Sequence, residues 1–203
     1  FEPGTDWEYS RATCVVGRLV EVISGQTLDV FLRKRILEPL GLPDTYFYLP
    51  VSKLSRFTSQ YRPDDSGKIV LVQAADKESS YVKEPHLYFS GSGGLVSTVS
   101  DYFRFLQMML NGGKLDDTRL LGKKTVELMT VNHIGNETVW LRGPGYGFGL
   151  GFSVLQDRGL AGNPASVGSY GWGGAYCTFF WVDPSESIIG VMMTQVRPYT
   201  HLN

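Results

Sequence analysis

The stretch "GSYGWGGAYCTFFWVDP", residues 168–184, places one indole between glycines, directly ahead of an aromatic run typical of a strand. Glycine weakens a strand, and it is tolerated there mainly where a ligand or another backbone must come close. Trp172 stands between Gly171 and Gly173-Gly174. This pattern indicates either a tight bend that carries a tryptophan or the floor of a binding site.

The composition limits the classes of function. The chain has 203 residues, enough to bury a core as one large domain or two small ones. Its net charge of −1 gives no electrostatic reason to expect nucleic acid or an anionic membrane surface as a partner. No apolar run reaches the roughly 18 residues that a membrane span needs. The spacings typical of metal, nucleotide and dinucleotide sites are missing, so no cofactor is expected.

The two cysteines, Cys14 and Cys177, do not make a disulfide framework. Each is surrounded in sequence by apolar residues, which favours buried, chemically inert thiols. A single disulfide between them stays open at this point.

Helical periodicity dominates the first two thirds of the chain. Residues 11–40 carry apolar side chains at helical spacing on both sides of Gly25, which predicts a helical hairpin. Residues 97–112 predict a longer helix, with Ser97 or Thr98 as its N-cap. The segment between these two helical regions contains a strand pair and then a long irregular stretch.

The strand patterns predict how the rest is organised. Two strands are expected at 56–62 and 68–73, and alternating apolar residues predict three or four consecutive strands near the C-terminus. Helices followed by a run of strands indicate an α+β fold with an antiparallel sheet. We expect residues 1–140 to form a mostly helical subdomain with a small hairpin and a long loop. Residues 141–203 are expected to form the C-terminal antiparallel strands.

One motif of serine hydrolases occurs formally. Ser80-Tyr81-Val82-Lys83 matches S-x-x-K, in which a lysine one helical turn from a serine accepts the hydroxyl proton. The match lies in the irregular stretch, not on a predicted helix, and such a short pattern is expected by chance in a chain of this composition. No G-x-S-x-G elbow is present, which argues against an α/β-hydrolase.

Four stretches together resemble one family in type, order and spacing. The chain resembles the serine β-lactamase/DD-peptidase superfamily, within the class C β-lactamase-like branch that includes the family VIII carboxylesterases. The resemblance covers nearly the whole chain and implies a β-lactamase/transpeptidase-like fold, with an antiparallel sheet packed by helices plus part of the helical subdomain. It is carried by the stretches "FEPGTDWEYS", "GRLVEVISGQTLDVFLRKRILEPLGLPDT", "GSGGLVSTVSDYFRFLQMMLNGG" and "GSYGWGGAYCTFFWVDP".

The family uses three motifs in chain order: S-x-x-K, then Y-x-N, then K-T-G or an esterase variant of it. Tyr9-Ser10-Arg11 resembles the second motif, and Trp172-Gly173-Gly174 resembles the third in its esterase form, W-G-G. The first motif has no counterpart ahead of Tyr9, and Ser80 comes after it. The resemblance therefore implies a fragment, incomplete at both ends, that lacks the nucleophile and is inactive alone.

The resemblance also assigns roles. Tyr9 would move a proton between the nucleophilic serine and the leaving group. A phenol is a poor base at neutral pH, so this role needs a nearby cation, which the family's lysine supplies. Gly173 and Gly174 would let a substrate carbonyl approach the strand edge. The N–H of Ala175 would then be one oxyanion-hole donor.

Two departures from the family pattern bear on the substrate. Trp172 stands where β-lactamases keep a lysine that pairs with the substrate carboxylate, and Arg11 stands where they keep asparagine. A tryptophan offers an apolar face and no charge, which favours neutral esters. Arg11 would restore positive charge if it pointed inward, and a solvent-facing side chain is the alternative.

The main hypothesis is a serine hydrolase that cleaves short-chain carboxylic esters through an acyl-enzyme. The alternatives are a β-lactamase or DD-peptidase, and a non-catalytic penicillin-recognising homologue. The expected ligand is a small ester or β-lactam-like molecule, with no nucleic acid. The expected protein partner is a second copy or the remainder of the same polypeptide. Location stays open between bacterial cytoplasm and periplasm.

Overall fold

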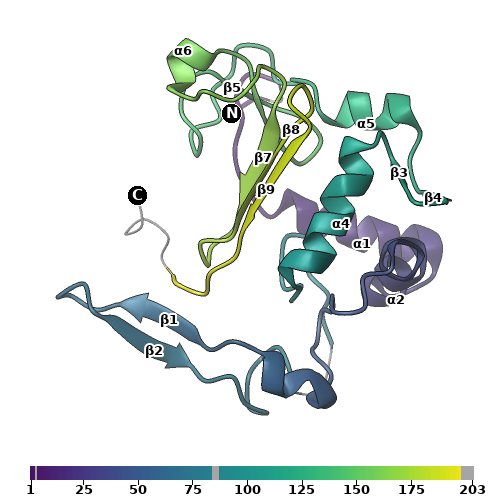
Figure 1. Cartoon of the computed structure of the whole chain (residues 1–203), viewed down its shortest axis with the longest axis vertical. Coiled ribbons are helices and arrows are strands. Elements are labelled where there is room, and N and C mark those ends of the chain that lie inside the picture. Colours follow the sequence, from purple (N-terminus) through teal and green to yellow (C-terminus); the bar gives the residue numbers. More distant parts are fainter. Residues whose placement is uncertain (3, 84–86, 198–203) are drawn as a thin grey trace. The chain divides into compact units, whose positions relative to one another are not determined.

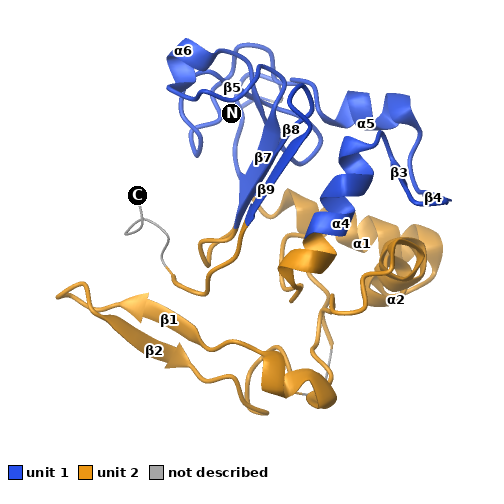
Figure 2. Cartoon of the chain, in the orientation of Figure 1, with its two compact units in different colours: residues 1–9, 103–173, 179–191 blue, residues 10–102, 174–178, 192–203 orange. Residues whose placement is uncertain are grey.

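The computed structural model describes residues 1–2, 4–83 and 87–197 (Figure 1). The chain divides into two compact units, each built from separate stretches of sequence (Figure 2). Unit 1 comprises Phe1–Tyr9, Phe103–Gly173 and Phe179–Val191, and unit 2 comprises Ser10–Tyr102, Gly174–Thr178 and Met192–Asn203. The subdomain boundary at residue 140 stays a prediction.

Unit 2 begins with the predicted helical hairpin. Helix α1 (Ala12–Ser24) ends at Gly25, whose left-handed φ of 66° lets its N–H donate to the carbonyl oxygen of Glu21. The chain then continues helically through α2 (Leu28–Leu32), the π-helical η1 (Arg33–Leu37) and α3 (Glu38–Leu40). The hairpin expected at 11–40 is confirmed.

The apolar stripe that predicts α1 is not its buried face. Val15, Val16 and Ile23 are more than half exposed, and Gly17 is the buried residue of this helix. A Cβ at Gly17 would lie 3.0 Å from the Cα of Gly91, so the helix meets its neighbour through bare backbone. Helical periodicity thus predicts the helix correctly but not the face on which it packs.

The remainder of unit 2 contains only short elements joined by irregular segments. The 3-10 helix η2 (Val51–Arg56) leads into a two-stranded antiparallel hairpin of β1 (Gln60–Pro63) and β2 (Ile69–Gln73), in which Tyr61 pairs with Leu71. The first strand begins four residues later than predicted, because η2 occupies its expected start. The described residues from 74 to 94 contain no helix or extended strand, as expected for a long irregular segment.

Helix α4 (Val99–Leu110) spans the boundary between the units, with residues from Phe103 onward in unit 1. Thr98 caps it, because its hydroxyl oxygen accepts from the N–H of Asp101 at 3.2 Å. The predicted choice between Ser97 and Thr98 is thereby resolved. Gly112, with φ of 66°, follows its C-terminus. Three short elements come next: β3 (Lys114–Leu115), β4 (Thr118–Arg119) and α5 (Lys123–Met129).

Unit 1 contains the main sheet, with strands in the order β5-β6-β7-β8-β9. The registers of the first four strands are antiparallel, and Trp172 pairs with Phe180 across β7 and β8. The strands and the small helix α6 have these bounds: β5 (Tyr146–Phe148), β6 (Ser153–Leu155), α6 (Arg158–Ala161), β7 (Tyr170–Gly173), β8 (Phe179–Asp183) and β9 (Ile188–Met192). The α+β fold with a C-terminal antiparallel sheet is confirmed.

The alternating residues 146–154 form two paired strands, β5 and most of β6. Gly151 has a φ of 101°, a conformation that side chains disfavour, and it lies in the turn between β5 and β6. Most of the fully buried side chains of unit 1 come from α4 and from the sheet, including Leu106, Met109, Val154 and Val182, and Val139 joins them from a loop. This core fixes β7, which carries Trp172.

Candidate active site

Four aromatic side chains of unit 1 form one cluster, which we call the aromatic cluster: Trp7, Tyr9, Phe148 and Trp172. The Tyr9 and Trp172 ring centroids lie 5.5 Å apart, with the ring planes inclined by 45°. Phe148 contacts Trp172 at 5.2 Å in an edge-to-face arrangement. The structure therefore brings together two of the predicted site residues, although 162 positions separate them in sequence.

Tyr9 remains accessible within the aromatic cluster. It is 48% exposed, whereas Trp7 and Trp172 are half-buried. Among the described residues, its hydroxyl has no hydrogen-bond partner. A phenol held at its ring and open at its oxygen can exchange a proton with an arriving group.

The other predicted residues lie at the end of β7 and in the turn after it. Gly173 ends β7, and the loop Gly174–Thr178 of unit 2 is closed by the Gly174 N–H donating to the Thr178 carbonyl oxygen at 2.8 Å. A Cβ at Gly174 would lie 2.3 Å from Thr178 Oγ1, so this position favours glycine. Ala175 is exposed, and within the described residues its N–H has no acceptor. That N–H is free to donate to a ligand oxygen.

Arg11 is an exposed residue at the N-cap position of α1. Its carbonyl oxygen accepts from the N–H of Cys14 at 2.9 Å. It belongs to unit 2, whereas Tyr9 and Trp172 belong to unit 1. A role for its guanidinium at the Trp172 strand stays a prediction.

The formal S-x-x-K match lies in a turn. Lys83 Nζ makes an ion pair with Glu78 Oε2 at 2.7 Å, which raises the pKa of the lysine. Ser80 is exposed and is not part of a helix. A lysine paired with a carboxylate stays protonated, so it cannot accept a serine proton at neutral pH. The arrangement agrees with a chance match.

Trp7 and Phe148 belong to the aromatic cluster but were not among the predicted site residues. Trp7 lies two positions before Tyr9, inside a stretch already recognised as family-like, and Phe148 belongs to the alternating pattern of the sheet. The N–H of Phe148 donates to Asn132 Oδ1 at 3.2 Å and its carbonyl oxygen accepts from His133. A search for aromatic residues near the Tyr motif would have found Trp7, whereas Phe148 needs the strand register.

Both cysteines are free thiols. Cys177 is buried, as expected, and adopts a positive φ of 56° in the β7–β8 turn. Cys14 is instead half-buried beside hydroxyl groups, with its Sγ 2.8 Å from Ser92 Oγ and 3.4 Å from Ser90 Oγ. The hydroxyls of Ser90, Ser92 and Tyr88 lower the pKa of the Cys14 thiol to about 6. Its surroundings are thus more polar than the sequence suggested.

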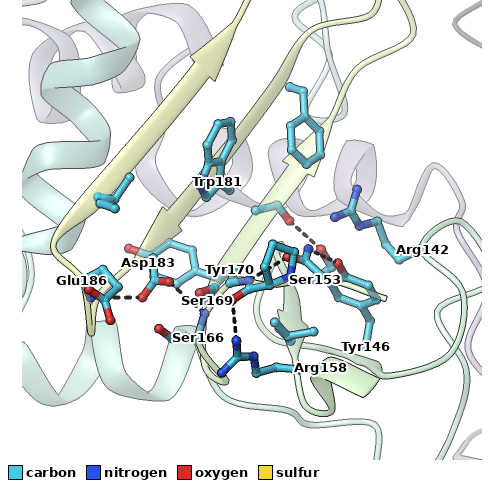
Figure 3. Close-up of a pocket in the computed structure, with 17 residues that line it drawn as sticks. Arg142, Tyr146, Ser153, Arg158, Ser166, Ser169, Tyr170, Trp181, Asp183 and Glu186 are labelled. Carbon is cyan, nitrogen blue, oxygen red and sulfur yellow. Dashed lines mark hydrogen bonds between the residues drawn. The ribbon is translucent and has the colours of Figure 1, made fainter. Parts of the chain in front are cut away.

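A cavity of about 510 Å³ lies elsewhere in unit 1 and contains none of the predicted site residues. Figure 3 shows Arg142 and Tyr146 at one side and Asp183 and Glu186 at the other, with Trp181 between them. The Arg142 guanidinium stacks between the rings of Tyr146, at 4.8 Å, and Phe179, at 4.9 Å. We call this region the sheet cavity.

Asp183 is the buried acid of the sheet cavity. Burial opposes its ionisation, but the N–H groups of Ser166 and Glu186 donate to the carboxylate and hold its pKa below the usual range. A third N–H, from Ser185, donates to Oδ1 at 3.1 Å. The carboxylate thus serves as a cap for the β8–β9 turn.

The described part of the chain contains neither a metal-binding group of side chains nor a helix that could span a membrane. Within residues 1–2, 4–83 and 87–197, no three or more His, Cys, Asp or Glu side chains lie close enough together to bind a metal ion. No helix in the same residues has the length and apolar character needed to cross a membrane.

Comparison with known proteins gives a consistent result. The profile described as Beta-lactamase matches residues 1–201. The chain is 33% identical to Protein Rv1367c of Mycobacterium tuberculosis, and the match covers 97% of this chain and 50% of that protein. It is 31% identical to Esterase EstB of Burkholderia gladioli, covering 96% of this chain and 50% of the esterase.

A solved structure agrees with these relatives. EstCE1, a hydrolase with promiscuous acyltransferase activity, superposes with a TM-score of 0.80 at 26% identity, covering 97% of this chain and 53% of EstCE1. The chain spans about half the length of the curated relatives that it matches. The family profile, these relatives and this fold agree, and the chain belongs to the beta-lactamase family.

Proposed function

We propose that this chain carries the tyrosine and W-G-G elements of a serine hydrolase that cleaves short-chain carboxylic esters through an acyl-enzyme. The observation that supports it is the contact of Tyr9 with Trp172, at 5.5 Å between ring centroids. The exposed Ala175 follows Trp172 by three positions in sequence. Its similarity to Esterase EstB and to the hydrolase EstCE1 agrees with this chemistry.

The proposed reaction has two steps. A serine Oγ, supplied with its lysine by sequence outside these 203 residues, attacks the ester carbonyl carbon and forms the acyl–oxygen bond. Tyr9 relays a proton: it gives its own phenolic proton to the departing alkoxide, which leaves as the alcohol, and takes the serine proton in its place. Water then attacks the acyl-enzyme by the reverse proton route and releases the acid. The Ala175 N–H would donate to the carbonyl oxygen as negative charge develops there.

The substrate class follows from Trp172. A cation at this position would pair with a substrate carboxylate. An indole instead buries apolar surface and forms no ion pair that could offset the desolvation of a carboxylate. Phe148 and Trp7 extend the same apolar surface. Neutral acyl esters are therefore the preferred substrates in this proposal.

A second candidate, a β-lactamase or DD-peptidase, depends on Arg11. This exposed guanidinium follows Tyr9 by two positions and is a cation able to bind a substrate carboxylate. A non-catalytic penicillin-recognising protein would use the same contact without turnover.

The test compares two substrates and two proteins. The intact protein and the 203-residue chain are assayed on p-nitrophenyl butyrate and on a chromogenic cephalosporin. We expect the intact protein to prefer the ester and the chain alone to be inactive. Ester turnover by the chain alone would contradict the proposal that the serine nucleophile lies outside the 203 residues. Ser80 would then be the candidate nucleophile. Cephalosporin turnover far above ester turnover in the intact protein would contradict the esterase assignment and favour the second candidate.

A matched pair of substitutions sharpens the substrate assignment. Trp172→Lys restores the family cation, and Trp172→Phe keeps an apolar ring. We expect Trp172→Lys to reduce kcat/KM for the butyrate ester by about tenfold or more, since placing a cation among apolar groups costs on the order of 1–3 kcal/mol. Trp172→Phe should stay within about threefold, because the ring contact survives. Equal losses in both variants would show that charge at this position does not decide the substrate.

A further inference from the structure

The N-terminal segment that carries Tyr9 has no regular structure of its own. The described residues among 1–9 form no helix or strand. Their recorded hydrogen bonds are local: the Thr5 N–H donates to the Glu2 carbonyl oxygen at 3.1 Å, and the Trp7 N–H donates to Asp6 Oδ1 at 2.7 Å. Such bonds shape the segment but do not attach it to the sheet.

Two rings join this segment to the sheet: Tyr9 contacts Trp172 at 5.5 Å, and Trp7 contacts both β5 and β7. The Trp7 ring centroid lies 5.0 Å from that of Phe148 on β5 and 6.3 Å from that of Trp172 on β7. The same ring stacks on Tyr9 at 6.4 Å with an interplanar angle of 28°. Trp7 thus touches both strands and the tyrosine at once.

The two residues that Trp7 contacts, Trp172 and Phe148, lie on paired strands of the sheet. Trp172 pairs with Phe180 inside the sheet, and Phe148 pairs with Ser153 on the neighbouring strand. The Phe148 backbone is held further by Asn132 and His133 on the preceding loop. Packing against Phe148 and Trp172 restricts the conformations of the Trp7 side chain. The Tyr9 ring, which stacks on Trp7, is restricted as a consequence.

We propose that Trp7 is the positioning residue for Tyr9: it anchors the irregular N-terminal segment to β5 and β7 and so holds the Tyr9 hydroxyl at the reacting serine. This inference rests on the proposed function, which gives Tyr9 the proton transfer. Trp7 itself touches no reacting atom. Its effect passes through the placement of Tyr9, and a misplacement of about 1 Å at a reacting group can cost roughly a hundredfold in rate.

The experiment is a double-mutant cycle in the intact protein, with p-nitrophenyl butyrate as substrate. Trp7→Ala, Tyr9→Phe and the double variant are compared with the parent protein. We expect Trp7→Ala to lower kcat about 10- to 100-fold while KM changes less than about threefold, since the lost interaction serves the proton transfer. In the Tyr9→Phe background, Trp7→Ala should change kcat less than about twofold, because the group it positions is already disabled.

Two further variants separate positioning from a general effect on folding. Trp7→Phe keeps a ring between Phe148 and Trp172, and it should recover most of the lost kcat. Phe1→Ala removes an aromatic ring from the same segment at a residue that is 76% exposed, and it should leave kcat unchanged. Thermal unfolding of each variant establishes that the protein is folded.

The outcomes distinguish this inference from the proposed function. If Tyr9→Phe retains parental activity, Tyr9 is not the proton carrier, and the proposed role fails together with the inference. If Tyr9→Phe is impaired but Trp7→Ala is as active as the parent, only the positioning role is overturned. Full additivity in the double variant, or a loss in Trp7→Ala expressed in KM alone, would also overturn it.

Discussion

One residue of the sheet cavity, Asp183, and one residue of the aromatic cluster, Tyr9, differ in how far the fold satisfies their polar atoms. In the sheet cavity, the Asp183 carboxylate accepts three backbone N–H groups and is 4% exposed. In the aromatic cluster, the Tyr9 hydroxyl has no partner within the described residues and the side chain is 48% exposed. The Asp183 carboxylate is therefore fully used by the fold, whereas Tyr9 offers an unused hydroxyl.

The volume of a cavity and the capacity of its polar groups to bind a substrate are therefore separate properties. Pockets are the usual first hypothesis for a site, but a buried group whose hydrogen bonds are satisfied by backbone has little capacity left for a substrate. The Arg142 guanidinium of the sheet cavity is held between two rings, and its buried Nε has no hydrogen-bond partner among the described residues. We infer that Asp183 of the sheet cavity serves the stability of unit 1, whereas the proposed function gives Tyr9 of the aromatic cluster a part in catalysis. Substitutions in the two regions should therefore affect different measurements.

The largest effect is expected at the aromatic cluster. Tyr9→Phe keeps the ring and its contact with Trp172 but removes the hydroxyl. We expect kcat/KM for p-nitrophenyl butyrate in the intact protein to fall by about 10²–10⁴-fold, the usual contribution of a positioned acid–base group. The free energy of unfolding should change little, because the hydroxyl is exposed. A loss of stability comparable with the loss of activity would remove the contrast with the sheet cavity.

The second effect is expected in stability and not in rate. Asp183→Ala leaves the N–H groups of Ser166, Ser185 and Glu186 without their acceptor. The free energy of unfolding measured in urea should fall by on the order of 2 kcal/mol, the usual cost of unsatisfied buried donors. Activity per folded molecule should stay within about twofold of the parent, since a stability role leaves the rate of the folded enzyme almost unchanged. A rate loss above tenfold with unchanged stability would reverse the assignment of the two regions.

The same carboxylate predicts a dependence on pH. The pKa of Asp183 is lower in the folded protein than its usual value, so its stabilising contribution is complete above the unfolded-state pKa, about 4. That contribution is lost as pH falls through the folded-state pKa. The matched variant Asp183→Asn cannot ionise. The difference in unfolding free energy between the parent and this variant should be constant from about pH 5 to 7 and should shrink below about pH 4. A constant difference down to pH 3 would contradict the role of the charge.

The sequence predicts those parts of this molecule that local patterns determine. Gly25 ends α1 and Thr98 caps α4, because glycine at positive φ and a hydroxyl before a helix act within a few residues. The resemblance of "EYSR" and "GWGG" to family motifs likewise identifies Tyr9 and Trp172 as a pair. Their contact within unit 1 agrees with that pairing.

Features that depend on tertiary packing are not predictable in this way. The apolar stripe of α1 predicts a helix, but its exposure depends on which segment the helix meets, and here the contact is made at Gly17. The pattern at 146–154 predicts strand structure but does not show that Gly151 turns the chain between β5 and β6. Phe148 reaches Trp172 through the register of β5, β6 and β7, which no local pattern encodes.

The smallest effect tests the sheet cavity without disturbing its acid. Arg142→Met keeps the apolar stem between the rings of Tyr146 and Phe179 but removes the cation. The free energy of unfolding should fall by about 1 kcal/mol, the scale of a partly exposed cation–π contact. Arg142→Lys keeps the charge but not the planar stacking group, so it should lie between Arg142→Met and the parent. Ester kcat/KM should stay at the parental value in both variants, because neither ring belongs to the aromatic cluster. A tenfold loss of kcat/KM in Arg142→Met would show that the two regions are coupled, and the division of unit 1 into a stability region and a catalytic region would then be wrong.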